Sequence, residues 1–324
     1  MAPSKRWTMA DLEPQSGKTI IVTGGNGGVG YEAARHLALK GANVTIVVRN
    51  PERGEAAATA IRQVLTAAGP AAGTVAVGVA DMADLASVRA FAAAFAASHP
   101  SLDVLLNNAG VMMLPRAVTK DGQEAQMATN HLGPFALTGL LLPLLAATPG
   151  ARIVNVASHA HRSCSDLALD DWTLERSYTP WAAYARSKVC NLLFTHELAR
   201  RLAAHGDGGG GGGGGDTPPV LAVTAQPGWA RTGLVGKATV AAPFTALMAV
   251  FQSVLSHSAE AGACPLVYAA TEADVRADDY WGPSFLGLRG PPAREKKAPM
   301  ATDAPASAAL WAKSEEVTGV SFLG

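Results

Sequence analysis

Two residues suited to proton transfer stand four positions apart in the chain, Tyr184 and Lys188. On a helix this spacing projects both side chains from the same face, one turn from each other. A phenol normally keeps its proton until roughly pH 10, and a neighbouring ammonium lowers that pKa by favouring the phenolate. The pair could therefore donate or accept a proton near neutral pH. The same spacing also occurs by chance on solvated helices, so the interpretation depends on the rest of the chain.

The residues before this pair indicate the helix that would carry it. Thr179 offers a hydroxyl at the N-cap, and Pro180 suits the first helical position. We expect the helix to continue as far as Ala204. The sequence thus predicts one rigid element beneath both side chains.

The composition describes a chain that can bury a large core and carries no excess charge. Its 324 residues are 48% hydrophobic, and 26 basic residues balance 26 acidic ones. This length allows one large domain or two small ones. The neutral balance gives no electrostatic footprint for nucleic acid or an anionic membrane.

Cysteine usage and targeting signals point to an intracellular protein. Cys164, Cys190 and Cys264 are widely spaced without a CxxC pair, which favours reduced thiols over a disulfide framework or a zinc site. Segment 1–17 lacks the apolar region of a signal peptide. The longest apolar run, 135–148, is too short to cross a bilayer and suggests a buried helix. We expect a cytoplasmic protein without a transmembrane segment, and an organellar location is also compatible.

A glycine-rich turn at 23–30 follows an apolar, β-branched run at 18–22 that has the pattern of a buried strand. A helical stretch over 31–40 comes next. Together these elements form a phosphate cradle, because glycines admit the pyrophosphate and the free N–H groups of the helix start bind it. The residues expected to contact a dinucleotide here are Gly24, Gly25, Asn26, Gly28, Val29 and Gly30.

The register of this turn is open, because several glycine patterns fit it. Gly25, Gly27 and Gly30 match the GxGxxG of two-domain dehydrogenases. Gly24, Gly27 and Gly30 match the GxxGxxG of sugar-nucleotide epimerases, and Gly24, Gly28 and Gly30 match TGxxxGxG. The later motifs have to decide between them.

Arg49 stands at the end of the second predicted strand, 43–48. An NAD site would place an Asp or Glu in this region to bind the ribose 2′-hydroxyl, but no carboxylate occurs before Glu52. An arginine can pair with a 2′-phosphate, so the sequence predicts NADP(H) as the cofactor. The alternative is an ordinary solvated arginine after a strand.

Polar and small residues follow the next predicted strands. Strand 74–80 leads to Asp81 and Met82, which we expect to contact the adenine, and strand 153–157 ends at Ser158. The carboxyl ends of parallel strands form the ligand crevice of an open α/β sheet. After strand 104–106, the expected cofactor contacts are Asn108, Ala109 and Gly110.

Strands alternate with helices over the first half of the chain, which predicts an α/β protein with a parallel, doubly wound sheet. The motifs along it occur in the order Thr23-Gly24-x-x-x-Gly28-x-Gly30, Asn107-Asn108-Ala109-Gly110, Thr129-Asn130-His131, Ser158, Tyr184-x-x-x-Lys188 and Pro227-Gly228. In this order they resemble the single-domain branch of the short-chain dehydrogenase/reductase family. Segments 152–161, 226–232 and 281–289 are similar to retinol-dehydrogenase-like members. The resemblance selects TGxxxGxG and implies a Rossmann-type sheet in a single domain.

The resemblance also implies catalytic roles. Tyr184 would exchange a proton with the substrate oxygen, while Lys188 would lower the pKa of Tyr184 and hold the nicotinamide ribose. Ser158 would donate a hydrogen bond to the same oxygen, and Asn130 would fix a water on a relay ending at Lys188. Hydride transfer to a carbonyl builds negative charge on oxygen, for which Ser158 and Tyr184 supply aimed donors.

Further family positions concern the cofactor. Thr232 resembles the residue that holds the nicotinamide carboxamide, and Pro227 and Gly228 are expected to line the cofactor. Two positions depart from the family pattern, since Ala157 replaces a common serine and Gln226 stands where histidine is frequent. Neither change removes a catalytic group.

Two histidines lie close to the predicted serine, His159 and His161. No carboxylate or cysteine spacing supports a metal site with them, so we predict no metal and interpret both as surface-loop residues. The longer stretch 166–178 is expected to form an acidic loop beside the site.

The remaining segments are expected to be variable additions to a core at 18–232. The glycine-rich stretch 206–219 suggests a flexible surface insertion. Segment 233–260 is expected to cap the substrate, because its helical spacing gives a strongly apolar surface; core packing or a dimer face is the alternative. The tail 289–324 is expected to be poorly ordered up to an amphipathic turn around Leu310–Trp311.

These observations predict an NADP(H)-dependent oxidoreductase that interconverts a carbonyl and an alcohol on an apolar small molecule, such as a retinoid, steroid or aldehyde. A tetrapyrrole double-bond reductase is an alternative, since the light-dependent protochlorophyllide reductases have a similar motif set. A non-catalytic NADP-binding scaffold is a third possibility, although the presence of Tyr184 and Lys188 argues against it. Expected partners are the apolar substrate and a possible second copy of the chain, with no nucleic acid.

Overall fold

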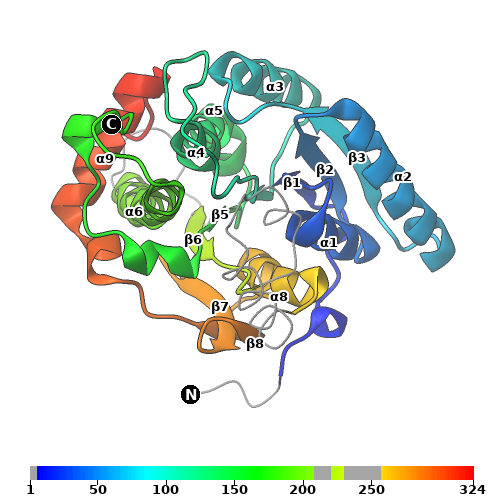
Figure 1. The fold of residues 1–324 in the computed structure, drawn as a ribbon. Coiled ribbons are helices and arrows are strands. Elements are labelled where there is room, and N and C mark those ends of the chain that lie inside the picture. Colours follow the sequence, from blue (N-terminus) through cyan, green and yellow to red (C-terminus); the bar gives the residue numbers. More distant parts are fainter. Residues whose placement is uncertain (1–5, 208–219, 230–256) are drawn as a thin grey trace, which may run out of the picture.

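Eight strands form one sheet in the order β3-β2-β1-β4-β5-β6-β7-β8 in the computed structural model, which describes residues 6–207, 220–229 and 257–324 (Figure 1). Strands β1 to β7 pair in parallel, and β8 returns antiparallel to β7. Their bounds are Thr19–Thr23 (β1), Asn43–Val48 (β2), Thr74–Val79 (β3), Val104–Asn107 (β4), Arg152–Val156 (β5), Leu221–Ala225 (β6), Tyr280–Phe285 (β7) and Arg289–Arg294 (β8).

Helices cover both faces of this sheet (Figure 1). On one face the core is completed by α1 (Gly28–Leu39), α2 (Pro51–Ala68) and α8 (Ala259–Thr271). On the other it is completed by α3 (Leu85–Ser98), α5 (Gly133–Ala146), α6 (Pro180–Asp207) and α9 (Ala304–Thr318). A short turn of helix, α4 (Ala125–Met127), precedes α5.

The central strand β1 shows why its sequence is a continuous apolar run. Ile20 and Val22 pack into the core on the α1 side, while Ile21 packs into the core on the α5 side. Successive side chains of a strand point to opposite faces, so a strand covered on both faces needs apolar residues at every position.

The chain first adds strands β2 and β3 on one side of β1 and then crosses over to add β4 on the other side. Strand β1 pairs with β2 on one side and with β4 on the other. The Thr23 hydroxyl at the end of β1 accepts hydrogen bonds from the N–H groups of Asn108 and Ala109, both at 2.9 Å. The glycine turn and the segment after β4 are thereby joined at the switch point, where open α/β sheets bind ligands.

The predicted doubly wound sheet is confirmed, and the five strands expected from the sequence between residues 18 and 157 lie within one residue of their predicted bounds. The expectation of a poorly ordered tail is wrong. Residues after Leu288 form β8 and α9, and Trp311 of α9 is 1% exposed against Phe135 and Phe194. The prolines of β8 are tolerated because this strand lies at the sheet edge, where one side needs no ladder hydrogen bonds.

Some expectations concern residues outside the described part of the chain. They include most of the glycine-rich insertion (208–219), Thr232, and most of the segment expected to cap the substrate (233–256). Within the ranges that are described, no helix has the length and apolar character needed to cross a membrane.

Candidate active site

Helix α6 carries Tyr184 and Lys188 and begins where the sequence predicts. Pro180 is its first residue, and the Thr179 hydroxyl accepts a hydrogen bond from the Ala182 N–H at 3.1 Å. Tyr184 and Lys188 are only 9% and 4% exposed. Their shared helix face therefore points into the protein and is not a solvated surface.

Ser158 meets Tyr184 just beyond the carboxyl end of β5. The strand ends at Val156, and the Ser158 hydroxyl lies close enough to the Tyr184 hydroxyl to oppose the rise in its pKa. The Ser158 Oγ also accepts a hydrogen bond from the Ala160 N–H at 3.2 Å. Two hydroxyl groups are thus held together at the sheet edge expected to bind ligands.

Lys188 completes this cluster from one helical turn further along α6. Its Nζ donates a hydrogen bond to the Val156 carbonyl at 2.8 Å and lies 5.8 Å from the centroid of the Tyr184 ring. Burial lowers the pKa of Lys188 to about 8. The structure therefore brings together three of the four residues expected to be catalytic.

The pKa of Tyr184 departs from the sequence expectation. Burial raises this pKa, and the hydrogen bond with Ser158 opposes the rise only in part. Lys188 is not among the groups that shift the pKa of Tyr184 in this structure, so the lowering of that pKa by Lys188 stays a prediction. The amine is bonded to the Val156 carbonyl and is itself buried, which favours its own neutral form.

Asn130 lies in a π-helical turn, Ala128–Leu132, a distortion that is frequent at functional sites. Its Oδ1 accepts from the Val111 N–H at 2.8 Å, and its Nδ2 donates to the Val111 carbonyl and the Ser187 hydroxyl, both at 2.9 Å. A Cβ on Gly110 would lie 3.2 Å from this Oδ1 and 3.6 Å from the Lys188 Nζ. Asn130 thus joins the segment after β4 to α6, while its water relay stays a prediction.

The glycine turn between β1 and α1 has no room for side chains at several positions, of which Gly30 and Gly24 face the segment after β4. A Cβ on Gly30 would lie 2.3 Å from the Asn108 Nδ2, and one on Gly24 would lie 3.0 Å from the Ala109 Cα. Gly24 also has a φ of +69°, a conformation that favours glycine. The other residues expected to contact the cofactor here occupy the same turn and the first turn of α1, namely Gly25, Asn26, Gly28 and Val29.

Arg49 follows β2 and faces Asp81, which lies just beyond β3. The Arg49 Nε is 4.0 Å from the Asp81 Oδ2, and the Arg49 side chain is 71% exposed. Met82, expected beside the adenine, has its side chain buried in the core with Phe91 and Phe135. Arg49 and Asp81 are therefore the accessible side chains at these strand ends.

Pro227 and Gly228 follow β6, and Gln226 organises the chain around them. The Gln226 Oε1 accepts from the Gly228 N–H at 2.8 Å. Its Nε2 donates to the Gly287 carbonyl at 2.7 Å and to the Glu295 Oε1 at 2.6 Å. Gln226 thereby ties the end of β6 to the β7–β8 hairpin.

The interpretation of His161 as a surface residue is wrong, whereas His159 is exposed as expected. His161 is fully buried in the 3₁₀ turn His159–Ser163, with its Nδ1 2.7 Å from the Ser158 carbonyl oxygen and its Nε2 accepting from the Ala298 N–H at 3.2 Å. Both ring nitrogens are occupied, so His161 has none left for a metal. The sequence signal that was missed is its spacing of three from Ser158, which suits a 3₁₀ turn.

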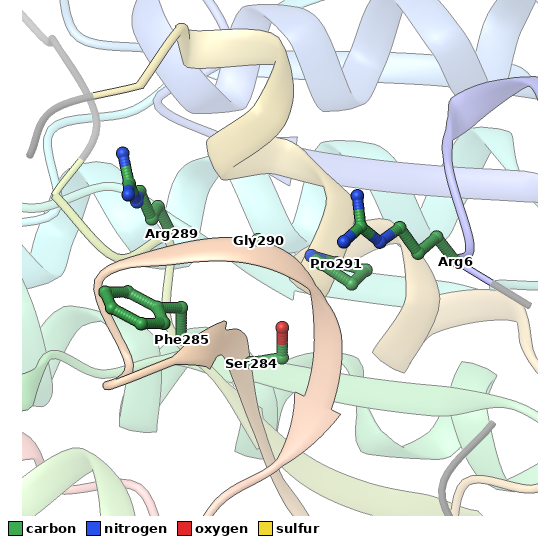
Figure 2. A pocket seen from close by; sticks show the side chains of 6 residues that line it. All are labelled: Arg6, Ser284, Phe285, Arg289, Gly290 and Pro291. Atoms are coloured by element: carbon green, nitrogen blue, oxygen red, sulfur yellow. The ribbon is translucent and has the colours of Figure 1, made fainter.

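A separate pocket of about 440 Å³ lies at the β7–β8 hairpin and contains none of the expected catalytic residues. Arg6 and Arg289 stand on opposite sides of it, with Ser284 and Phe285 from the hairpin between them (Figure 2). This pocket is therefore distinct from the cluster of Ser158, Tyr184 and Lys188 at β5.

Two human relatives share sequence with the chain. Retinol dehydrogenase 12 is 44% identical over 196 residues, which cover 59% of this chain and 58% of that protein. The chain therefore spans little more than half the length of that relative. Retinol dehydrogenase 13 is 37% identical over 309 residues, covering 94% of this chain and 85% of that protein. The expected resemblance to retinol dehydrogenases is thereby confirmed.

Solved structures share the fold. A putative uncharacterized protein from Mycobacterium paratuberculosis superposes with a TM-score of 0.78 at 39% identity, covering 98% of this chain and 99% of that one. A blue fluorescent protein from a metagenomic library, in complex with NADPH, gives a TM-score of 0.59 at 26% identity, covering 81% and 93%. The sequence model of the short chain dehydrogenase family matches residues 18–234. With the cluster at β5 and the glycine turn at β1, this match establishes that the chain belongs to the short-chain dehydrogenase/reductase family of oxidoreductases.

Proposed function

We propose that the chain is an NADP(H)-dependent oxidoreductase that interconverts a carbonyl and an alcohol on an apolar small molecule. The observation that carries this proposal is the Tyr184 hydroxyl beside that of Ser158, with Lys188 buried one helical turn away and its Nζ 5.8 Å from the Tyr184 ring centroid. The pair lies at the carboxyl end of β5, and β5 and β1 both run parallel to the β4 strand between them. The proton-transfer groups and the glycine turn therefore both lie at the carboxyl ends of the parallel strands.

The residues at this edge fit NADP(H). Gly24 and Gly30 let the turn pack closely against Asn108 and Ala109, and the start of α1 offers N–H groups to a pyrophosphate. The exposed guanidinium of Arg49 can pair with a 2′-phosphate. NADPH in the related metagenomic protein supports the same assignment. When bound, the nicotinamide supplies or accepts the hydride.

The protein side chains supply the proton and the charge stabilisation. As a carbonyl is reduced, negative charge builds on its oxygen, and the hydroxyls of Ser158 and Tyr184 stabilise it as hydrogen-bond donors. Tyr184 then gives its proton to this oxygen. The Lys188 amine, which is protonated below about pH 8, favours the phenolate that Tyr184 becomes. In the oxidation direction the same phenolate accepts the proton of the alcohol.

An apolar substrate is supported by the surroundings of Tyr184. Trp181 precedes it on α6, is 47% exposed, and has its ring centroid 6.1 Å from that of Tyr184. Met112 packs against the Tyr184 cluster from the segment after β4. An exposed indole and a thioether beside the reacting hydroxyl suit an apolar carbonyl compound, as does the likeness to human retinol dehydrogenases.

Cofactor oxidation by the purified chain tests this proposal. We expect NADPH to be consumed with all-trans-retinal and decanal, with kcat/KM at least tenfold higher than for glyceraldehyde, a polar aldehyde, because even one methylene group buried in an apolar pocket is worth about 1–3 kcal/mol. A preference for glyceraldehyde would contradict the apolar site. Consumption with protochlorophyllide alone would favour the tetrapyrrole reductase, and tight NADPH binding without any turnover would favour the scaffold.

A further inference from the structure

His161 is a buried histidine that links the serine of the proposed site to the chain after β8. Its Nδ1 lies 2.7 Å from the Ser158 carbonyl oxygen, and its Nε2 accepts a hydrogen bond from the Ala298 N–H at 3.2 Å. The ring also packs edge to face on Tyr280 of β7, with centroids 5.4 Å apart and planes at 90°. Every part of the imidazole is therefore in contact with the protein.

These contacts fix the protonation of the ring. A nitrogen that accepts from an amide N–H must carry a lone pair, and a nitrogen that bonds a carbonyl must carry the proton. His161 is therefore the neutral tautomer with its proton on Nδ1. Burial acts in the same direction by lowering the pKa of His161 to about 4, helped by the nearby cations Arg162 and Lys297.

The bonds of this turn converge on Ser158. Its carbonyl oxygen accepts from the backbone N–H of His161 at 3.1 Å in addition to the imidazole, and its Oγ accepts from the Ala160 N–H at 3.2 Å. The orientation of the Ser158 hydroxyl toward Tyr184 therefore depends on the 3₁₀ turn, and the buried imidazole of His161 is bonded at both ends of its ring to hold this turn in place.

We propose that His161 is a positioning residue that aims the Ser158 hydroxyl, and that it couples the segment after β8 to this serine through the Ala298 N–H. A second contact joins the same segments, because the Arg162 guanidinium donates to the Lys296 carbonyl. The inference rests on the proposed function for the role of Ser158. It adds a residue that touches neither substrate nor cofactor.

Three substitutions separate positioning from core packing. In His161→Asn the amide nitrogen can replace Nδ1 as donor to the Ser158 carbonyl, while His161→Phe fills the space with no polar atom. Ala298→Pro removes the N–H donor to Nε2, and the φ of −65° at Ala298 already suits proline. Ser314→Ala is the matched control, since it removes the hydroxyl bonded to another buried histidine, His131.

We expect His161→Phe to lower kcat with retinal about tenfold and Ala298→Pro to lower it about threefold, as expected for the loss of a single neutral hydrogen bond. The KM for NADPH should stay within twofold, and His161→Asn should recover most of kcat. Ser314→Ala should keep wild-type kcat. Equal kcat loss in His161→Asn and His161→Phe would overturn the proposal, and so would a wild-type kcat in His161→Phe.

Hydrogen exchange measured without substrate distinguishes this inference from the proposed function. If His161 holds the turn, the amides of Ala160 and Ala298 exchange at least tenfold faster in His161→Phe, while His161→Asn keeps the Ala160 amide protected. This holds even if the wild-type chain reduces no carbonyl compound, in which case only the proposed function fails. Unchanged protection of the Ala160 amide in His161→Phe would overturn the positioning role.

Discussion

The Lys188 Nζ and the Val156 carbonyl oxygen lie 2.8 Å apart, and this hydrogen bond joins α6 to the last residue of β5. It holds the amine over the Tyr184 ring, 5.8 Å from the ring centroid, at a site that is almost fully buried. Among the residues that the structure describes, one carbonyl and no carboxylate stabilise a cation in this position. The structure therefore keeps a lysine whose charge is costly, which is typical of a group retained for function.

Substituting Lys188 by Met should change the pH dependence of stability. The folded protein lowers the pKa of Lys188 from 10.5 to about 8, so the charged amine opposes folding. This cost is fully present below pH 8 and disappears as the pH rises to 10.5. At 1.36 kcal/mol per pH unit, it amounts to at most about 3 kcal/mol. Relative to wild type, Lys188→Met should thus be most stable at pH 7 and lose most of that advantage by pH 10. Urea unfolding of both proteins between pH 7 and pH 10 measures this difference in stability. A difference that does not change with pH would contradict the prediction.

Removing the Tyr184 hydroxyl should stop turnover and leave cofactor binding intact. Loss of the proton donor in Tyr184→Phe should lower kcat by roughly 10²–10⁴-fold. The Kd for NADPH, measured by fluorescence, should stay within about threefold, because one hydroxyl contributes little to binding a whole dinucleotide. The control is Tyr178→Phe, since the Tyr178 hydroxyl bonds the Leu114 carbonyl at 2.7 Å and lies outside the cluster. Retained turnover in Tyr184→Phe would show that the proton donor is misassigned.

Reversing the charge at Arg49 should change the preference between cofactors. If the guanidinium pairs with the 2′-phosphate, Arg49→Asp should weaken NADPH binding by roughly 10–100-fold, the value of a charge-assisted hydrogen bond. Binding of NADH, which has no such phosphate, should change by less than about threefold. Arg53→Asp, an exposed arginine in the first turn of α2, serves as the control for a general loss of positive charge. Equal losses for NADPH and NADH in Arg49→Asp would exclude the phosphate contact.

The glycine turn allows a matched pair of alanine substitutions. A Cβ on Gly30 would lie 2.3 Å from the Asn108 Nδ2 and 2.6 Å from the Gly24 carbonyl oxygen, whereas one on Gly27 would meet no atom within 4 Å. Gly30→Ala should therefore destabilise the fold by about 1–3 kcal/mol through overpacking, and Gly27→Ala should be close to neutral. Thermal unfolding of both variants without cofactor checks this. Similar melting temperatures would show that Asn108 can move aside.

Local patterns explain why much of the fold and the site could be predicted. The alternation of strands and helices, the glycine turn and the Tyr184–Lys188 spacing are all written within short windows of sequence, and the structure places them as expected. Ser158 could be found because it follows a strand whose apolar run is unmistakable. The rise in the pKa of Tyr184 could not be predicted in this way, because it depends on how deeply α6 is buried. It also depends on the hydrogen bond that directs the Lys188 amine to the Val156 carbonyl of β5.

The parts that were missed depend on contacts between distant segments. His161 is recognisable as structural only when Ala298, far along the chain, donates to its ring. The tail beyond Leu288 is rich in proline, alanine and charge, and its order comes from packing Trp311 into a core made by α5 and α6. Composition alone gives no sign of such a partner, so a local reading favours disorder.

Trp311 should accordingly be one of the most important residues for stability. Its ring lies 4.7 Å from that of Phe322, 5.2 Å from that of Phe135 and 4.5 Å from the Arg201 guanidinium. Trp311→Ala should cost about 3–5 kcal/mol, because a large cavity opens where α9 meets α6. Glu316→Ala on the same helix removes only an exposed ion pair with Lys313 and should cost less than about 1 kcal/mol. Denaturant unfolding measures both losses. A loss of less than about 1 kcal/mol in Trp311→Ala would mean that α9 is not part of the cooperative fold.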